Sequence, residues 1–72
     1  MPILLRNIKS GAFFKTQSEW TSSSKNALDF GERDRAIRIA LELGLTNLEL
    51  VITKEDGTFV LAAPVSKSVV GG

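Results

Sequence analysis

The chain has 72 residues, of which 43% are hydrophobic, and a formal net charge of +1. It contains no cysteine, histidine or tyrosine, which excludes disulfides, imidazole or thiolate metal ligands, thiol nucleophiles and imidazole or phenol acid–base catalysis within these residues. So short a chain has little depth in which to shift the pKa values of its remaining polar groups. We therefore expect one small domain with no enzyme activity, no cofactor and no metal site.

The first part of the sequence predicts a β-hairpin. Residues 3–8 are typical of a strand with apolar side chains on both faces, and Pro2 fits in front of it, where no ladder donor is lost. Ser10 and Gly11 form a turn signal, and residues 12–15 begin a returning strand. The polar stretch that follows predicts a loop or irregular strand through Trp20 and then a short turn over residues 25–30.

A helix is expected over residues 34–43. Gly31 is an acceptable N-cap, Asp34 complements the helix dipole in the first turn, and Gly44 lies where a left-handed C-cap residue is needed. The apolar arc of this helix covers about 200°, wider than the ~100° that a surface helix requires. Either the sheet curls round the helix and covers this arc, or part of the arc contacts another molecule.

The sequence after the helix predicts a second hairpin. Residues 48–53 alternate as a strand, Asp56 and Gly57 form a turn, and residues 58–65 return, with Pro64 indicating an edge or an end. Residues 66–72 have little to bury and predict a flexible C-terminal tail. The expected architecture is an α+β domain over residues 1–65, with the order β-β-α-β-β and an antiparallel or mixed four-stranded sheet packed on one helix.

The leading hypothesis for function is a small non-enzymatic interaction module that self-associates, as a homo-oligomer, or docks on a protein partner. Its candidate surface combines the flanks of the helix face with the aromatic residues of the first hairpin. Phe13 and Phe14 are adjacent in a strand and point to opposite faces, so a helix covering one face leaves the other ring open. The candidate residues are Ile39, Leu43, Phe13, Phe14 and Trp20.

Weak nucleic-acid binding through the first hairpin is the alternative hypothesis. Charge is unevenly spread, since the first 28 residues carry four bases and one acid. Arg6, Lys9 and Lys15 are the candidate phosphate contacts, and aromatic side chains beside bases on an open sheet are typical of single-strand binders. The other interpretation of these bases is a set of solvated side chains on the rim of a sheet.

Part of the pattern resembles a class of short bacterial domains of unknown function. The resemblance rests on Ala36 and Ala40 in the helix, on residues 49–52 as Glu-Leu-Val-Ile, and on Asp56-Gly57 followed by an aromatic residue. Such domains carry a tryptophan in a hairpin, an alanine-spaced helix and a closing hairpin. The resemblance implies this element order and brings no known activity.

Gly71 and Gly72 resemble the terminus of ubiquitin-like modifiers and of the small sulfur carriers of molybdopterin and thiamine synthesis. The resemblance implies a terminal carboxylate that is adenylated and then conjugated or thiolated. A carrier of this kind is the lesser alternative for function.

No run of the sequence reaches the roughly 18 apolar residues that a membrane-spanning helix needs. The first residues also lack the charged start, apolar centre and small-residue cleavage site of a signal peptide. We therefore expect a cytoplasmic protein with no membrane partner.

Overall fold

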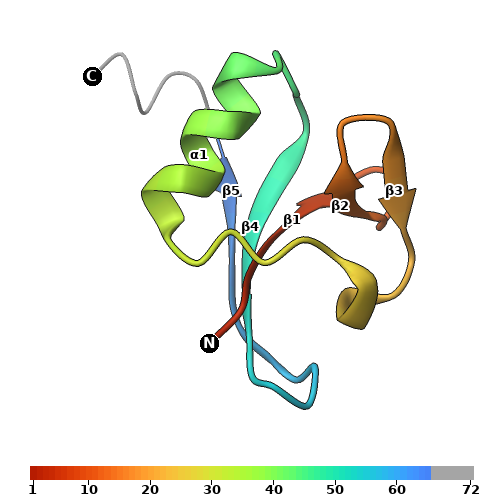
Figure 1. Cartoon of the computed structure of the whole chain (residues 1–72), viewed down its shortest axis with the longest axis vertical. Helices are drawn as coiled ribbons and strands as arrows, with labels where there is room; N and C mark the ends of the chain where they lie inside the picture. The colour runs from red at the N-terminus through yellow and green to blue at the C-terminus, as the bar shows by residue number, and fades with distance from the viewer. Residues whose placement is uncertain (66–72) are drawn as a thin grey trace.

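The computed structural model describes residues 1–65 as an α+β fold, in which one helix packs on a single antiparallel sheet of five strands (Figure 1). The elements in chain order are β1 (Ile3–Asn7), β2 (Phe13–Thr16), β3 (Glu19–Thr21), the 3-10 turn η1 (Ser24–Asn26), α1 (Arg33–Glu42), β4 (Leu48–Thr53) and β5 (Phe59–Val65). In space the strands follow the order β3-β2-β1-β4-β5. The predicted tail at residues 66–72 lies outside the described residues.

The α+β class and the antiparallel sheet are confirmed, but the prediction of four strands was wrong. The fifth strand is β3, which has three residues and pairs antiparallel with β2, with Trp20 opposite Phe14 and Glu19 opposite Thr16. Three residues are too few for an alternation of apolar and polar side chains to be recognised, so the sequence suggested a loop or irregular strand there.

The first strand of the chain lies at the centre of the sheet. β1 pairs with β2 on one side and with β4 on the other, where the register runs from Ile3 opposite Ile52 to Asn7 opposite Leu48. Leu4 and Leu5 point to opposite faces of β1, and both are fully buried. A central strand with apolar residues on both faces therefore needs cover on both sides of the sheet.

The first core lies between the sheet and α1. Ala36 and Ala40, the two buried residues of the helix, face the sheet, and their small side chains let the helix backbone come close to it. The segment before the helix adds Phe30, which also donates its backbone N–H to the Ile3 carbonyl at 2.8 Å. The buried members of this cluster are Leu5, Phe14, Phe30, Ala36, Ala40, Leu48 and Leu50.

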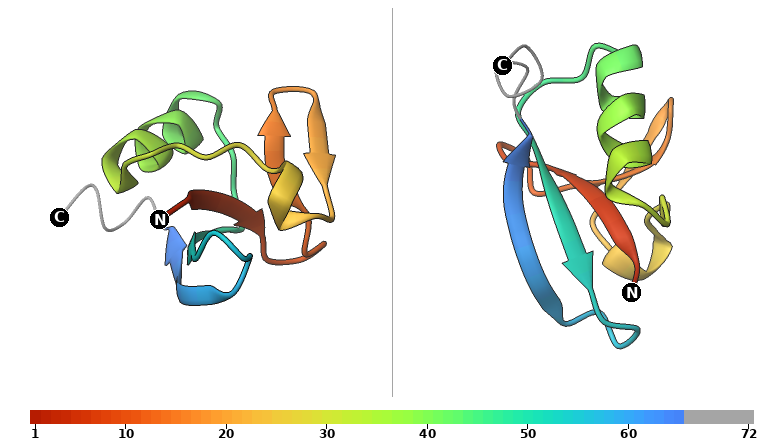
Figure 2. Two further views of the ribbon diagram at one scale, coloured as in Figure 1. Left: turned by 60° about the horizontal axis from the view of Figure 1, so that its bottom comes forward. Right: turned by 90° about the vertical axis from the view of Figure 1, so that its left-hand side faces the viewer.

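A second, smaller core lies on the opposite face of the sheet. It consists of Leu4, Phe13 and Val51, with Ala27 packed against it. The ring of Phe59 on β5 meets the ring of Phe13 on β2 edge to face, with the centroids 6.0 Å apart. β1 and β4 separate these two strands, so the contact requires a strongly twisted sheet, as the two views in Figure 2 show.

The helix begins at Arg33, with Glu32 as its N-cap, so the expectation of Gly31 in that role was wrong. Gly31 has φ +78, in the left-handed region, whereas an N-cap residue is extended. Its N–H donates instead to Oδ1 of Asp29 at 2.9 Å, and the same oxygen accepts the N–H of Ile3 at 3.0 Å. Asp29 thus ties the start of β1 to the chain that enters the helix.

The end of the helix follows the expected glycine cap. Gly44 has φ +66, and its N–H donates to the Leu41 carbonyl at 3.1 Å. The next residue, Leu45, donates to the Ala40 carbonyl at 3.0 Å. These two bonds form a Schellman motif, which stops the helix and turns the chain toward β4.

The hairpin between β4 and β5 closes through a tight turn. Gly57 has φ +90, as the turn signal predicted, and Lys54 donates its N–H to the Thr58 carbonyl at 2.8 Å. Oδ1 of Asp56 accepts the Thr58 N–H at 2.9 Å, and this backbone hydrogen bond lowers the pKa of Asp56 from its ordinary value. Where β5 begins, the register shifts, because Leu61 pairs with Ile52 but Phe59 pairs with Thr53. Val60 is therefore the extra residue of a β-bulge.

Candidate interaction surface

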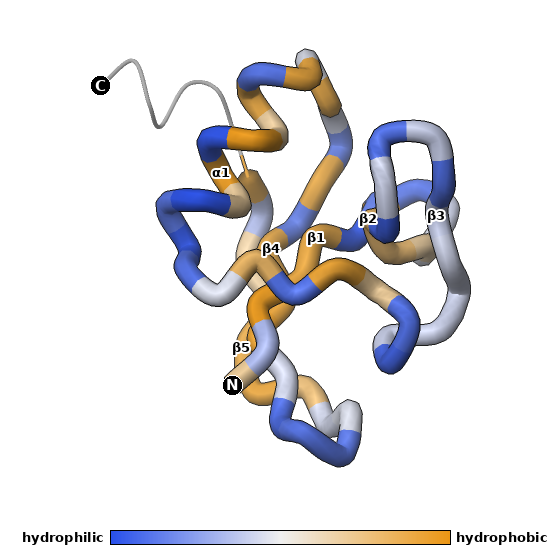
Figure 3. Tube along the Cα trace, in the orientation of Figure 1, coloured by the Kyte–Doolittle hydropathy of each residue, from blue (hydrophilic) through white to orange (hydrophobic). Residues whose placement is uncertain are grey.

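β5 is the outermost strand at one edge of the sheet, and its first half carries large exposed apolar side chains. Phe59, Val60 and Leu61 are 42%, 48% and 46% exposed. In Figure 3 hydrophobic residues follow β4 and β5, whereas the tip of the β2–β3 hairpin is hydrophilic. Of the strands in residues 1–65, β5 is also the one without a charged side chain. We call residues 59–65 the β5 edge.

The proline in β5 shows which backbone groups of this edge face outward. Paired residues of an antiparallel ladder alternate between hydrogen-bonded and non-hydrogen-bonded pairs. Pro64 has no N–H, so its pair with Glu49 belongs to the non-hydrogen-bonded class. By alternation the pair of Ala62 with Val51 belongs to the same class. The N–H and the carbonyl of Ala62 therefore point away from β4, toward the open side of the sheet.

The opposite edge of the sheet has a different character. β3 has three residues against the seven of β5, and the Nζ of Lys15 lies 3.7 Å from a carboxylate oxygen of Glu19 beside it. Short length and charged side chains are the usual protection of an edge strand against pairing with another chain. The β5 edge lacks both, and its protective features are Pro64 and the bulge at Val60 near its start.

The phenylalanines that were expected on the interaction surface lie inside the protein. Phe13 and Phe14 do point to opposite faces of β2, but both are buried, one in each core. Neither of these two rings is left on an open face, because Phe59 covers Phe13 and the chain around Phe30 covers Phe14. The surface predicted from the sequence therefore does not form around these two residues.

The other expected surface residues are only partly accessible. Ile39 and Leu43 are half-buried and pack against the core beneath α1, so the wide apolar arc of the helix is partly covered by the protein itself. Trp20 is 37% exposed, and its ring meets that of Phe14 edge to face at 5.5 Å. Ile39 lies on α1 and Leu43 just after it, whereas Trp20 lies on β3 at the other edge of the sheet from β5.

Two of the three candidate phosphate contacts are paired with acids. Nε and Nη2 of Arg6 donate to Oε2 of Glu49 at 3.1 and 2.8 Å. The guanidinium also lies over the rings of Phe59 and Phe13, at 5.1 and 5.8 Å from their centroids. Lys15 lies beside Glu19, as described above. Lys9 is exposed in the turn after β1. The geometry therefore joins Arg6 to the second core and does not gather the three bases into one basic patch.

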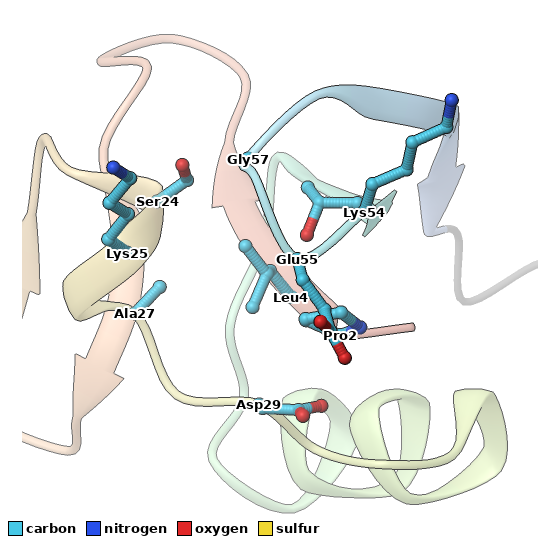
Figure 4. A pocket seen from close by; sticks show the side chains of 10 residues that line it. Pro2, Leu4, Ser24, Lys25, Ala27, Asp29, Lys54, Glu55 and Gly57 are labelled. Carbon is cyan, nitrogen blue, oxygen red and sulfur yellow. The ribbon is translucent and has the colours of Figure 1, made fainter.

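A pocket of about 160 Å³ lies between the N-terminus, η1 and the β4–β5 turn (Figure 4). Its floor is apolar, from Pro2, Leu4 and Ala27. The side chains of Lys25 and Lys54 extend away from Leu4 in Figure 4, so their amines do not converge on a ligand position. The rest of the lining consists of Ser24, Asp29, Thr53, Glu55 and Gly57.

Sequence reasoning identified β5 as a strand but did not single out its exposed apolar side chains as a candidate surface. The available signal was the run of seven uncharged residues from Phe59 to Val65, together with Pro64, which indicated an edge or an end. What the sequence did not show was which strand would lie outermost. In a sheet of order β3-β2-β1-β4-β5, the two edges belong to the shortest strand and to the longest one.

α1, the α-helix of residues 1–65, has ten residues, which is too short to cross a membrane. In the same part of the chain, acidic side chains form no group of three or more that could hold a metal ion. Comparison with protein-family models, with curated proteins and with solved structures found no match to this chain.

Proposed function

We propose that this chain is a non-enzymatic protein-interaction module whose contact surface is the β5 edge. One observation carries the proposal: an outermost strand of seven residues with no charge begins with three large apolar side chains that are more than 40% exposed. An exposed apolar edge strand is a template for pairing with another chain, unless charges, bulges or short length prevent it. β5 is long and uncharged, and its bulge at Val60 lies near its start, so the strand from Leu61 onward is regular.

The chemistry of such a surface is strand addition. Outward-facing backbone groups, here those of Ala62, give affinity, and the exposed side chains on either side give selectivity. A fully buried aromatic side chain removes roughly 200 Å² from water, and each Å² contributes about 25 cal/mol. Phe59 is 42% exposed, so burial of that remaining part alone contributes about 2 kcal/mol. The absence of histidine, cysteine and tyrosine from the sequence supports a binding role over a catalytic one.

Nucleic-acid binding by the first hairpin has less support. Arg6 already donates two hydrogen bonds to Glu49, and the aromatic rings of β2 are buried. A labelled oligonucleotide at low salt tests this alternative directly, since phosphate contacts make affinity fall as salt rises.

A photoreactive amino acid placed in the β5 edge tests the proposal in the intact chain. The probe replaces Leu61, and a matched control replaces Leu28, which is also a leucine and is 41% exposed against 46%. Leu28 lies in the segment beside β2, where its N–H donates to the Phe14 carbonyl. We expect illumination in cells to join the Leu61 probe to protein far more than the Leu28 probe. Equal yields from the two positions, or no protein adduct at Leu61, would contradict the proposal.

A further inference from the structure

We infer that the partner of the β5 edge is a second copy of this chain, paired strand to strand and antiparallel across a two-fold axis at Ala62. The inference rests on the proposed function and adds to it the identity of the partner and the register. The pairing extends each sheet into that of the other copy, with one continuous sheet across the dimer.

Charge favours a second copy over a foreign strand. A partner that binds an edge strand usually matches its charges, and β5 offers none from Phe59 to Val65. A strand that is itself uncharged and apolar meets this surface without leaving a charge unpaired. β5 of another copy is such a strand, and the two-fold arrangement presents the same patch from both sides.

The outward-facing backbone groups select the register. At Ala62 both the N–H and the carbonyl point away from β4. When Ala62 lies opposite Ala62 of the second copy, the two residues exchange both of their hydrogen bonds. A two-fold axis at Ala63 would instead place Ala62 opposite Pro64 and lose one bond from each such pair, because proline has no N–H. With the axis at Ala62 the central pair keeps both of its bonds and Pro64 lies opposite Val60, so Pro64 favours this register over the one centred on Ala63.

Side-chain size fits the same register. With Ala62 at the axis, Leu61 of one copy lies opposite Ala63 of the other. Both residues are on the face of the sheet that carries α1, since they pair with Ile52 and Leu50 of β4. The large, exposed leucine thus meets a small side chain, and each copy covers the leucine of the other.

Sedimentation of the full chain tests whether the dimer exists. The concentration range extends to about 1 mM, where even weak association is visible. We expect a reversible monomer–dimer equilibrium. Ala62→Pro removes the central donor but no bond to β4, so the monomer keeps its fold, which circular dichroism checks. This variant should weaken the dimer at least about thirtyfold, as expected for two lost hydrogen bonds. A wild-type chain that sediments as a monomer throughout overturns the inference.

A single introduced cysteine tests the register independently of stability, since the chain has no cysteine of its own. Opposite residues of a hydrogen-bonded antiparallel pair have Cα atoms about 5.5 Å apart, within the roughly 4.4–6.8 Å that a disulfide spans. Under mild oxidation Ala62→Cys should form a covalent dimer rapidly, and Leu28→Cys, at an exposed position beside β2, should not. A dimer that Ala62→Pro leaves unchanged, or equal cross-linking at both positions, overturns the register.

The two tests separate this inference from the proposed function. If the Leu61 probe captures other proteins while the chain sediments as a monomer, the second copy is the wrong partner and the β5 edge remains a binding surface. If the probe captures nothing, both fail. If it captures only a second copy of the chain, both stand.

Discussion

Arg6 provides the sharpest test of the second core. It lies at the centre of the sheet opposite Glu49, and its guanidinium is enclosed by that carboxylate and by the rings of Phe13 and Phe59. The side chains of the two ionic partners are 27% and 15% exposed, so water reaches them only in part. The arginine thus joins four strands, β1, β2, β4 and β5, on one face of the sheet.

Arg6→Met keeps the apolar stem of the side chain and removes the guanidinium. The Glu49 carboxylate then loses both of its donors and stays partly buried. Hydrogen bonds to charged groups contribute about 1.5–3 kcal/mol, and a cation over an aromatic ring about 0.5–1 kcal/mol. Since partial exposure lets water solvate the freed carboxylate, we expect a loss of about 2 kcal/mol in the free energy of unfolding.

The double variant Arg6→Met with Glu49→Met should be more stable than Arg6→Met alone. Replacing both ionic partners by apolar side chains of similar length removes the unpaired charge, and such replacements are often neutral or stabilising. We expect the double variant to lie within about 1 kcal/mol of the wild type.

Urea unfolding followed by far-UV circular dichroism and by the fluorescence of Trp20, the single tryptophan, measures these differences. All variants are compared at one low protein concentration, so that self-association does not contribute. For a chain of this size, 2 kcal/mol corresponds to a fall of roughly 10 °C in Tm. If the double variant loses the sum of the two single losses, the pair and its rings do not act as a unit, and the reasoning is wrong.

Three further predictions concern the first core and the turns. Phe14→Ala should cost about 3–5 kcal/mol, because the ring is buried, whereas Trp20→Ala should cost clearly less; equal losses in urea unfolding would refute this. Gly44→Ala should lower stability by about 1 kcal/mol, because the φ of Gly44 is in the left-handed region. Nothing lies within 4 Å of the added Cβ, so a thermal melt should report this conformational cost without a steric clash. The lowered pKa of Asp56 adds stability that is present above its ordinary value of 3.8 and lost as pH falls through the folded-state pKa. NMR titration of the carboxyl should show a smaller shift in Thr58→Pro, which removes both the N–H and the hydroxyl donor of residue 58.

The sequence predicted the elements that depend on local signals. Gly44 ends the helix and Gly57 turns the second hairpin, as expected, because a positive φ at those positions is a property of the residue and its neighbours. The α1 boundaries differ from the prediction by one residue at each end. Only β3 was missed as a strand, since three residues carry no periodic pattern.

The parts that depend on distant contacts were not predictable in the same way. One ring of the pair Phe13 and Phe14 was expected on an open face. Phe13, on the face away from α1, is instead covered by Phe59, which lies 46 positions later in the chain and three strands away across the sheet. Arg6 looked like a phosphate contact because its acid partner, Glu49, is 43 residues away. The apolar side chains of the β5 edge are exposed because β5 lies outermost in the strand order, which a single sequence does not reveal.

The central place of β1 has a consequence for how the chain folds. Its pairing with β4 joins residues 43 positions apart, as for Arg6 and Glu49, whereas the β1–β2 and β2–β3 pairs are local. Closing so long a loop is the slow step for pairs of this kind. During synthesis the first hairpin emerges with Leu4, Leu5 and the open side of β1 unprotected, and they stay so until β4 leaves the ribosome. The nascent chain is therefore most prone to wrong pairing at the strand that is best protected in the finished protein.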